Sequence, residues 1–364
     1  MFVYKTKNPC YNEKNVCAGR RRKKRVFFSA ARQRLRVPPG ARGAGPCGGV
    51  LRGAGRKGGT AVFGVKIKSH AKVNLSLNIT GERGGYHLLD SVVCSVNVWD
   101  TVCAKARRDR LVNVYMHGRG SEAIPPGRNN AVLAGEAFVS AFSTRGADIE
   151  IYKDIPMGAG LGGSSADAAG VLRAMARLYG VPAERLKPLA DSLGSDTGYL
   201  LGGGFARLSG RGERVEPLAS PRGYDMLLFL PPTPVSTAAC YRRYDDAPDP
   251  LRADSARLAA ALERGDFAGV AANVYNALQS PACALNADVA KALEEAASFS
   301  PAACAVTGSG SAVFALFESE ELCRWAKSRY RGSFAVRVVR TLAPPRRLHN
   351  PFVLRPGEGA PRDD

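Results

Sequence analysis

The sequence predicts an α+β protein with two domains. Its 364 residues are more than one ordinary domain holds, and they provide ample apolar surface for two cores. Residues 149–180 predict a strand, a glycine-rich loop and a helix. Residues 287–342 follow the order helix, strand, strand, helix, strand, which is typical of a ferredoxin-like domain. The expected divisions are a basic extension at 1–60, an N-terminal α/β domain at 61–220, a ferredoxin-like C-terminal domain at 221–342 and a loose tail at 343–364.

The segment at 149–180, IEIYKDIPMGAGLGGSSADAAGVLRAMARLYG, predicts a phosphate-binding loop. It begins with β-branched residues, contains four glycines between 158 and 163, and continues with apolar residues at helical spacing. Gly180 and Pro182 end the expected helix. Backbone N–H groups in such a loop can converge on an anion at the positive end of the helix. A plain strand-to-helix turn needs fewer glycines, so phosphate binding is the favoured interpretation.

Two familiar phosphate loops do not fit this segment. The Walker pattern is absent because no lysine precedes the serines. Gly158, Gly160 and Gly163 match GxGxxG, but a dinucleotide site also needs a second strand that ends in an acid about twenty residues later. Glu184 stands at that distance inside a predicted helix, which disfavours a dinucleotide site.

The other elements follow in chain order from Val62, where the folded part is expected to begin. Alternating residues at 62–81 predict two strands or one bent strand, on which Lys72 and Asn74 share a side. Before the glycine-rich segment we expect a Val-rich strand, a strand at 111–116 and a helix at 129–142. After it we expect a helix, a turn bearing Asp196, a glycine triplet and a strand, then a strand at 226–230 and a helical segment at 255–278.

The net charge of +20 is concentrated at the N-terminus. Residues 1–60 contain 16 Lys and Arg and one acid, Glu13, whereas residues 61–364 contain 36 basic and 31 acidic side chains. The run GRRRKKR at 19–25 and the Gly/Arg/Pro stretch at 37–59 have little to bury and are expected to be disordered. Three interpretations remain open: a non-functional extension, an Arg-rich organelle transit peptide and a nucleic-acid-binding arm.

Cysteine and histidine usage argues against a metal cluster. The nine cysteines lack CxxC spacing, and the four histidines lack the spacing of metal ligands, which together favour a reducing compartment. No apolar run is long enough to span a membrane, and no secretory signal is evident. We therefore expect a cytoplasmic bacterial protein, or a plastid protein if the N-terminus is a transit peptide.

Three stretches together resemble the motifs of the GHMP kinases. AKVNLSLNITGERGGYHLLDS at 71–91, PMGAGLGGSSADAA at 156–169 and TGSGSAVFALF at 307–317 are similar to motifs one, two and three, in the same order. The resemblance extends from about residue 66 to 340. The triplet GYH at 85–87 makes the resemblance more specific. It is similar to the family members that phosphorylate the 2-hydroxyl of 4-diphosphocytidyl-2-C-methyl-D-erythritol in the non-mevalonate isoprenoid pathway. It implies ATP and Mg²⁺ as cofactors, small-molecule substrates and no membrane partner, and leaves monomer or homodimer open.

The resemblance also implies roles for particular residues. Asp196 would be the general base that takes the proton from the substrate hydroxyl, and Lys72 would keep Asp196 ionised and orient that hydroxyl. His87 would hydrogen-bond the cytosine edge, and Tyr86 and Tyr241 would stack on the base. The implied substrate contacts are Asn74, Tyr86, His87 and Tyr241. The implied ATP-binding residues are Pro156, Met157, Gly158, Ala159, Gly160, Leu161, Gly162, Gly163, Ser164, Ser165 and Ala166, joined on the phosphate side by Thr307, Gly308, Ser309 and Gly310 of motif three, with Ser165 nearest to Mg²⁺.

The chain departs from the family pattern at three places, one of which is NVYNALQS at 273–280, where the acids often seen in the family segment are lacking. Ser164 stands where the family usually has a glycine, and Ala166 stands where it has a second serine. Thr197 and Gly198 follow Asp196 in place of Val-Pro, which could move the turn that carries the proposed base.

Other interpretations stay open on the residues alone. Lys72 is also explained as a solvated strand lysine, Tyr86 as a half-buried aromatic residue and Asp196 as a turn aspartate. Within the same family, a homoserine or mevalonate type of kinase is the alternative, which Tyr86 and His87 disfavour. A nucleic-acid-binding protein is the alternative from a different class, and its affinity would reside in residues 1–60.

Overall fold

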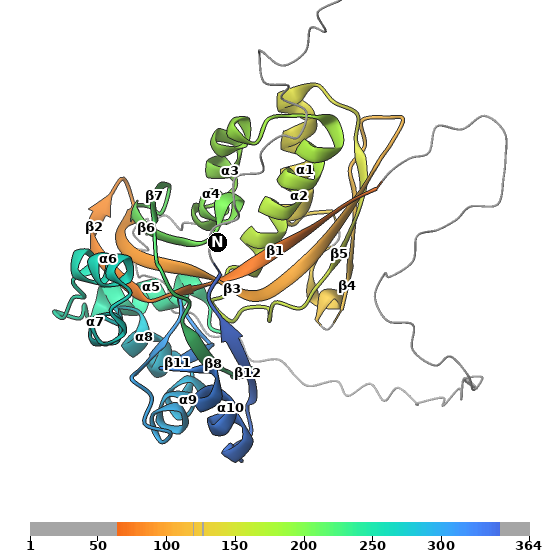
Figure 1. The fold of residues 1–364 in the computed structure, drawn as a ribbon. Coiled ribbons are helices and arrows are strands. Elements are labelled where there is room, and N and C mark those ends of the chain that lie inside the picture. Colours follow the sequence, from red (N-terminus) through yellow and green to blue (C-terminus); the bar gives the residue numbers. More distant parts are fainter. Residues whose placement is uncertain (1–63, 119, 126, 343–364) are drawn as a thin grey trace, which may run out of the picture. The chain divides into compact units, whose positions relative to one another are not determined.

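The computed structural model describes residues 64–118, 120–125 and 127–342 (Figure 1). The predicted extension at 1–60 and tail at 343–364 lie outside the described residues, so their expected disorder and the three interpretations of the extension stay predictions. No helix among the described residues is long and apolar enough to cross a membrane.

The first sheet is mixed and is organised around β3, a strand of 21 residues. β3 pairs antiparallel with β1, β2, β5 and β6, while β4 pairs parallel with β5 and the short β9 pairs parallel with β2. The strands of this sheet are β1 (Val65–Asn74), β2 (Ser76–Arg83), β3 (Tyr86–Ala106), β4 (Asn113–His117), β5 (Ala147–Tyr152), β6 (Phe205–Gly210), β7 (Arg214–Leu218) and β9 (Tyr275–Asn276).

Four helices gather beside the long strands β1, β3 and β5 (Figure 1). Helix α2 is central among them because it contacts α1, α4, β1 and β3. Five of its eleven buried residues are alanines and one is Gly170, and these small side chains let the helix approach the sheet closely. The helical segments of this part are η1 (Ser121–Ala123), α1 (Asn130–Phe142), α2 (Gly163–Tyr179), η2 (Ala183–Leu186), α3 (Lys187–Leu193) and α4 (Ser195–Gly202).

The second sheet has four antiparallel strands in the order β10-β11-β8-β12. This order, with helices following the first and third strands, is the ferredoxin-like arrangement that the sequence predicts. The strands are β8 (Asp225–Leu230), β10 (Ala303–Val306), β11 (Val313–Phe317) and β12 (Ala335–Arg340). The helices are α5 (Thr237–Asp246), α6 (Ser255–Arg264), α7 (Phe267–Ala272), α8 (Gln279–Leu285), α9 (Ala287–Ala297) and α10 (Glu320–Arg329).

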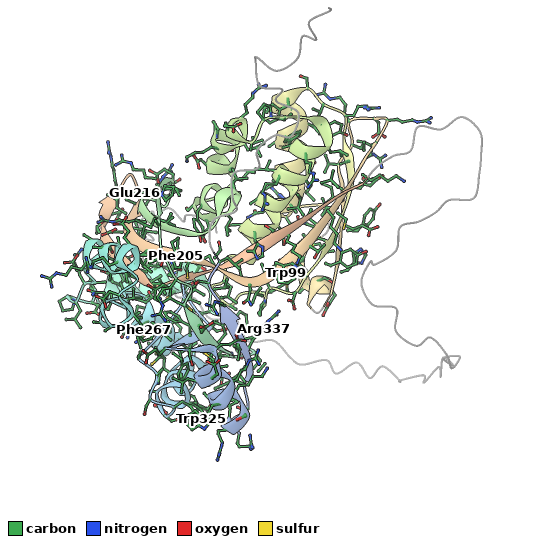
Figure 2. All side chains as sticks on the ribbon, in the orientation of Figure 1. Trp99, Phe205, Glu216, Phe267, Trp325 and Arg337 are labelled. Carbon is green, nitrogen blue, oxygen red and sulfur yellow. The ribbon has the colours of Figure 1, made fainter. Side chains whose placement is uncertain are left out.

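One buried apolar cluster joins the two sheets. It contains Val73 of β1 together with Leu228 of β8 and Phe314 of β11. Phe205 of β6 and Phe267 of α7 both pack against the ring of Tyr224 at centroid distances of 5.9 and 6.3 Å, and both phenylalanines are labelled in Figure 2. The two sheets therefore share a core, and the expected domain division near residue 220 stays a prediction.

Three segments differ from the expected secondary structure. The helical segment expected at 255–278 is divided, because Gly265 adopts a left-handed conformation (φ 67°) after α6 and the side chain of Asp266 caps α7. Helix α5 was not expected, and it begins where the Ser236 hydroxyl accepts a hydrogen bond from the Ala239 amide. The sequence predicts a non-helical turn at Asp196, whereas the structure places Asp196 in the first turn of helix α4.

Candidate active site

The glycine-rich loop lies between β1 and the turn of motif three. The Lys72 amide donates to the Leu161 carbonyl (3.0 Å), and the Ala312 amide donates to the Ala159 carbonyl (3.1 Å). Gly160 has φ 75°, and a Cβ atom there would lie 2.1 Å from the Thr307 carbonyl oxygen. The loop can approach motif three this closely only because the residue is glycine.

A cavity of about 260 Å³ opens beside this loop. Ten of the eleven loop residues predicted to bind ATP line it, from Pro156 to Ser165. Ala166 is buried behind them, and its carbonyl accepts a hydrogen bond from the Ser69 hydroxyl. Helix α2 begins at Gly163, so the first amide groups of a helix without a side-chain cap stand beside the cavity. That arrangement suits an anion.

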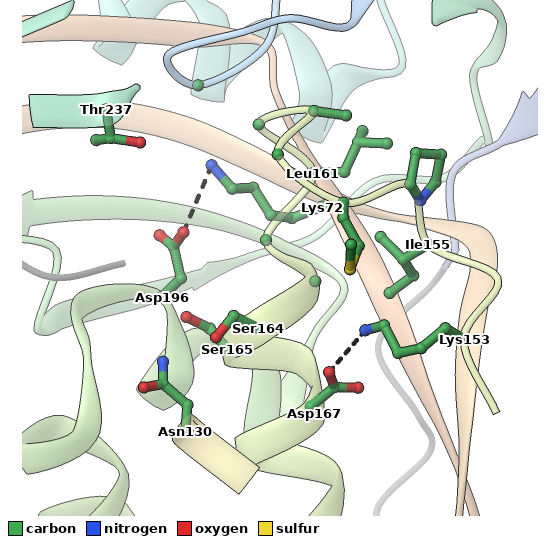
Figure 3. A pocket seen from close by; sticks show the side chains of 18 of the residues that line it. Lys72, Asn130, Lys153, Ile155, Leu161, Ser164, Ser165, Asp167, Asp196 and Thr237 are labelled. Atoms are coloured by element: carbon green, nitrogen blue, oxygen red, sulfur yellow. Dashed lines mark hydrogen bonds and ion pairs between the residues drawn. The ribbon is translucent and has the colours of Figure 1, made fainter. Parts of the chain in front are cut away.

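The two serines at the start of α2 differ in exposure. Ser164 is exposed, whereas Ser165 is 1% exposed, although both line the cavity (Figure 3). The sequence favours Ser165 as the hydroxyl nearest to Mg²⁺, and the structure makes Ser164 the more accessible of the two.

Lys72 and Asp196 meet at the wall of this cavity. Lys72 comes from β1 and Asp196 from the first turn of α4, and Nζ lies 3.6 Å from Oδ2 (Figure 3). Their side chains are 3% and 11% exposed, so Lys72 is not a solvated strand lysine. Asp196 Oδ2 has no hydrogen-bond partner among the described residues, although it is buried. Oδ2 faces Lys72, and a carboxylate held ionised in this way at a cavity wall can accept a proton from a bound alcohol.

Asn74 lies behind Lys72 rather than at the cavity. Its Oδ1 accepts from Lys72 Nζ (2.5 Å) and its Nδ2 donates to the Ser91 hydroxyl (2.8 Å). The Asn74 backbone amide donates to Thr307 Oγ1 (3.0 Å). The residue is 4% exposed and does not line the cavity. The amide group therefore orients Lys72, and its predicted contact with substrate stays untested.

Motif three forms the opposite wall. Gly308, Ser309 and Gly310 line the cavity, while Thr307 is fully buried and accepts the Asn74 amide. Ser309 Oγ and Thr237 Oγ1 lie 2.8 Å apart, which connects this wall to the start of α5. All three sequence motifs thus meet at one cavity.

A buried ionic cluster beside the cavity was not found from the sequence. Lys153 Nζ contacts the carboxylates of Asp100 and Asp167, in the latter case at 2.6 Å (Figure 3). Asp100 also accepts the backbone amides of Asp154 and Ile155 at 2.6 and 2.9 Å, which fixes the segment that leads into the glycine-rich loop. Burial raises the pKa of the Asp167 carboxyl, and Asp167 Oδ1 has no hydrogen-bond partner among the described residues.

Lys153 and Asp167 both line the cavity. Asp100 does not; it lies on β3, 53 residues before Lys153, which directly follows β5. Asp167 stands two residues after Ser165 of motif two, which is the one signal in the sequence that could have indicated it. Asn129 and Asn130 at the start of α1 are further lining residues that the sequence did not indicate.

The structure brings His87 and Tyr241 together. Their ring centroids are 4.6 Å apart, and His87 Nε2 lies 2.7 Å from Oδ1 of Asp245 on α5. Burial, and then the charge of nearby Asp196, raise the pKa of the Tyr241 hydroxyl. Tyr241 thus contacts His87 and lies within electrostatic range of the proposed base.

Tyr86 faces a different space. Consecutive residues of a strand point to opposite faces, so Tyr86 points away from its neighbour His87. It lines a second cavity of about 770 Å³ between the β2–β3 and β6–β7 hairpins, and the Arg211 guanidinium lies 5.0 Å from its ring centroid. The predicted stacking of Tyr86 and Tyr241 on one base stays a prediction.

The comparisons with known proteins agree with this geometry. Residues 129–205 match the model of the GHMP kinases N terminal domain, and residues 258–324 match the model of the GHMP kinases C terminal domain. The 4-diphosphocytidyl-2-C-methyl-D-erythritol kinase of Pelotomaculum thermopropionicum is 35% identical over 282 residues, which are 76% of this chain and 97% of the relative. The enzyme of the same name from Shouchella clausii is 34% identical over 76% of this chain and 94% of the relative.

Two solved structures extend the likeness to the fold. A 4-(cytidine 5'-diphospho)-2C-methyl-D-erythritol kinase matches with a TM-score of 0.62 and 29% identity over 76% of this chain and 99% of that chain. A homoserine kinase from Cytophaga hutchinsonii matches with a TM-score of 0.61 at 18% identity, over 80% of this chain and 98% of that chain, which shows the fold alone. With three motifs at one cavity and relatives of this similarity, the chain belongs to the GHMP kinase family, in the branch of the 4-diphosphocytidyl-2-C-methyl-D-erythritol kinases.

Proposed function

We propose that this protein transfers the γ-phosphoryl group of ATP to the 2-hydroxyl of 4-diphosphocytidyl-2-C-methyl-D-erythritol, a step in the non-mevalonate formation of isoprenoid precursors. The observation that carries the proposal is the Lys72–Asp196 pair in the same cavity as the glycine-rich loop. The relatives named above support the choice of acceptor, and because they are bacterial proteins they favour a bacterial source over a plastid.

The cavity supplies the parts that phosphoryl transfer needs. The loop amides and the start of α2 would bind the phosphates of ATP, and motif three would close on them from the other side. Asp196 would take the proton of the acceptor's 2-hydroxyl while the hydroxyl oxygen forms a bond to the γ-phosphorus of ATP. The bond from the γ-phosphorus to the oxygen that bridges it to the β-phosphorus breaks at the same time, and ADP leaves. Lys72, held by Asn74, would keep Asp196 ionised and orient the hydroxyl.

The residues at the start of α2 fit a Mg²⁺ ion. Mg²⁺ in kinases is bound by one or two carboxylates and the substrate phosphates, and it keeps several waters. Asp167 Oδ1 is a buried carboxylate oxygen without a partner among the described residues, and Ser164 and Ser165 stand beside it at the cavity. Asp167 and Ser165 would therefore hold the ion, which when bound neutralises charge on the transferred phosphoryl group.

The acceptor would lie toward His87 and Tyr241. The two rings contact each other at a centroid distance of 4.6 Å, and Tyr241 lies within electrostatic range of Asp196, so a base held there would place the rest of the acceptor near the proposed general base. Tyr86 and the arginines of the second cavity would contact a further part of the same anionic acceptor.

A competition between acceptors tests the proposal. ADP release by the full chain is measured with MgATP and, in turn, with the cytidylylated methylerythritol, free methylerythritol, homoserine and mevalonate. We expect turnover with the first acceptor alone. Turnover with homoserine or mevalonate, and none with the cytidylylated compound, would replace this function by that of another kinase of the same family.

A further inference from the structure

We propose that Asp245 is a specificity-determining positioning residue: by accepting the Nε2 proton of His87 it presents Nδ1 as a hydrogen-bond acceptor, which selects a cytosine base and rejects uracil. The inference rests on the proposed function, because it concerns the base of the same acceptor. Asp245 lies on α5, outside the three sequence motifs, and would be an additional residue of the acceptor site.

The His87–Asp245 contact decides which nitrogen carries the proton. Nε2 lies 2.7 Å from Asp245 Oδ1, and an ionised carboxylate can only accept a hydrogen bond. Nε2 must therefore donate. In a neutral imidazole the other nitrogen, Nδ1, then has a lone pair and no proton.

The surroundings hold the ring in that orientation. The ring of Tyr241 covers one face of the imidazole at a centroid distance of 4.6 Å and an interplanar angle of 30°. The His87 side chain is 10% exposed, so most of it is enclosed and a narrow part remains accessible. Within the described residues Nδ1 makes no hydrogen bond, which leaves it for a bound ligand.

An acceptor at this position distinguishes the two pyrimidines. Cytosine carries a 4-amino group, which donates, whereas uracil carries a carbonyl oxygen at the same place, which accepts. Nδ1 without a proton would pair with the amino group and repel the carbonyl oxygen. One such contact changes the ratio of the affinities for cytosine and uracil by roughly 10- to 100-fold.

Asp245 contacts His87 but not the cavity in which phosphoryl transfer would take place. It stands on the last turn of α5 with a side chain that is 39% exposed, and it does not line the cavity that contains Asp196. Its removal should therefore change the preference between bases more than the rate of phosphoryl transfer.

The variant Asp245→Asn tests the inference, because a carboxamide can turn its N–H toward Nε2 and allow the proton to move to Nδ1. Asp246→Asn is the matched control: it removes the same charge from the next residue, which is exposed. The probes are CDP and UDP, titrated calorimetrically at pH 8 with the ATP site saturated by a non-hydrolysable ATP analogue. Nitrogen-15 NMR of the His87 ring reports its tautomer in the same samples.

We expect the parent and Asp246→Asn to bind CDP at least about 10-fold more tightly than UDP, and Asp245→Asn to lose most of this ratio while its His87 signal shifts toward the Nδ1-protonated form. An unchanged ratio in a folded Asp245→Asn, or a parent that binds both equally, would overturn the inference. Because binding is measured without turnover, failure of the proposed kinase activity would be seen separately in the ADP-release assay.

Discussion

Lys72 Nζ lies 3.6 Å from Asp196 Oδ2, and the two side chains come from a strand and a helix more than a hundred residues apart in the sequence. Both are buried, and the ammonium also donates to the Asn74 amide oxygen. Asn74 thus orients the lysine, and Oδ2 of Asp196, the oxygen that faces Lys72, makes no hydrogen bond within the described residues. This relationship gives the first two predictions.

Asp196→Asn should nearly abolish turnover. A carboxamide cannot take the proton of the acceptor hydroxyl, so we expect kcat to fall about 10²- to 10⁴-fold. The KM for ATP should change little, because the phosphate loop is untouched. Steady-state ADP release with circular dichroism as a check on folding measures both. Retention of the parent's kcat would remove Asp196 from the mechanism.

Asn74→Ala should lower kcat without a matching rise in the KM of the acceptor, because Asn74 orients Lys72 and does not line the cavity. Removing its amide takes one hydrogen-bond partner from Lys72, which keeps Asp196, and one from Ser91, which keeps the Ser76 carbonyl, at a cost of about 1–3 kcal/mol in unfolding free energy. Asn78→Ala is the control, since Asn78 is a buried asparagine on the next strand whose amide bonds Ala253 and Ser255 away from the cavity. It should lose similar stability in urea titrations and keep the parent's kcat. A rise in acceptor KM alone in Asn74→Ala would instead support direct substrate contact.

Gly160→Ala should destabilise the protein and weaken ATP binding together. The left-handed backbone at φ 75° and the approach of a new Cβ to the Thr307 carbonyl would both oppose the substitution. We expect the free energy of unfolding to fall by roughly 2–5 kcal/mol, of which about 1–2 come from the left-handed backbone and about 1–3 from overpacking. Gly84→Ala separates the two effects, because Gly84 has φ 63° with no atom within 4 Å of the added Cβ. Equal losses in thermal denaturation of both variants would contradict the tight packing of the loop.

Asp167→Asn should weaken the binding of a divalent ion. With one carboxylate oxygen fewer near the phosphates, we expect at least about 10-fold weaker Mn²⁺ binding in the presence of a non-hydrolysable ATP analogue. The electron paramagnetic resonance signal of unbound Mn²⁺ measures this without turnover. Asp154→Asn is the control, because its carboxylate is exposed and pairs with Arg337. Equal Mn²⁺ affinity in both variants would exclude Asp167 as a ligand.

The sequence predicted the parts of the fold and site that depend on neighbouring residues. The strand, loop and helix at 149–180 and the ferredoxin-like order after residue 287 carry local signals, and both are present. The shared side of Lys72 and Asn74 also follows from the strand period alone, and the bond between them confirms it.

What the sequence did not reveal depends on contacts across long separations. Nothing local connects Asp100 with Lys153, or His87 with Asp245, because these pairs form only when distant strands and helices pack. The role of Asn74 was uncertain for a related reason, since a buried amide that orients a lysine and one that contacts a substrate look the same in a sequence. That Tyr86 and His87 point in opposite directions could, in contrast, have been predicted from the alternation of side chains along a strand.

The contact of Gly160 with Thr307 has a consequence for the protein's synthesis. The phosphate loop takes its shape from residues that the ribosome adds about 150 positions later, because Ala312 and Thr307 supply a hydrogen bond and a packing surface to Ala159 and Gly160. A nascent chain that ends before Thr307 has the loop sequence but not its support. We therefore expect ATP to protect the finished protein from proteolysis and to leave such a truncated chain as susceptible as before.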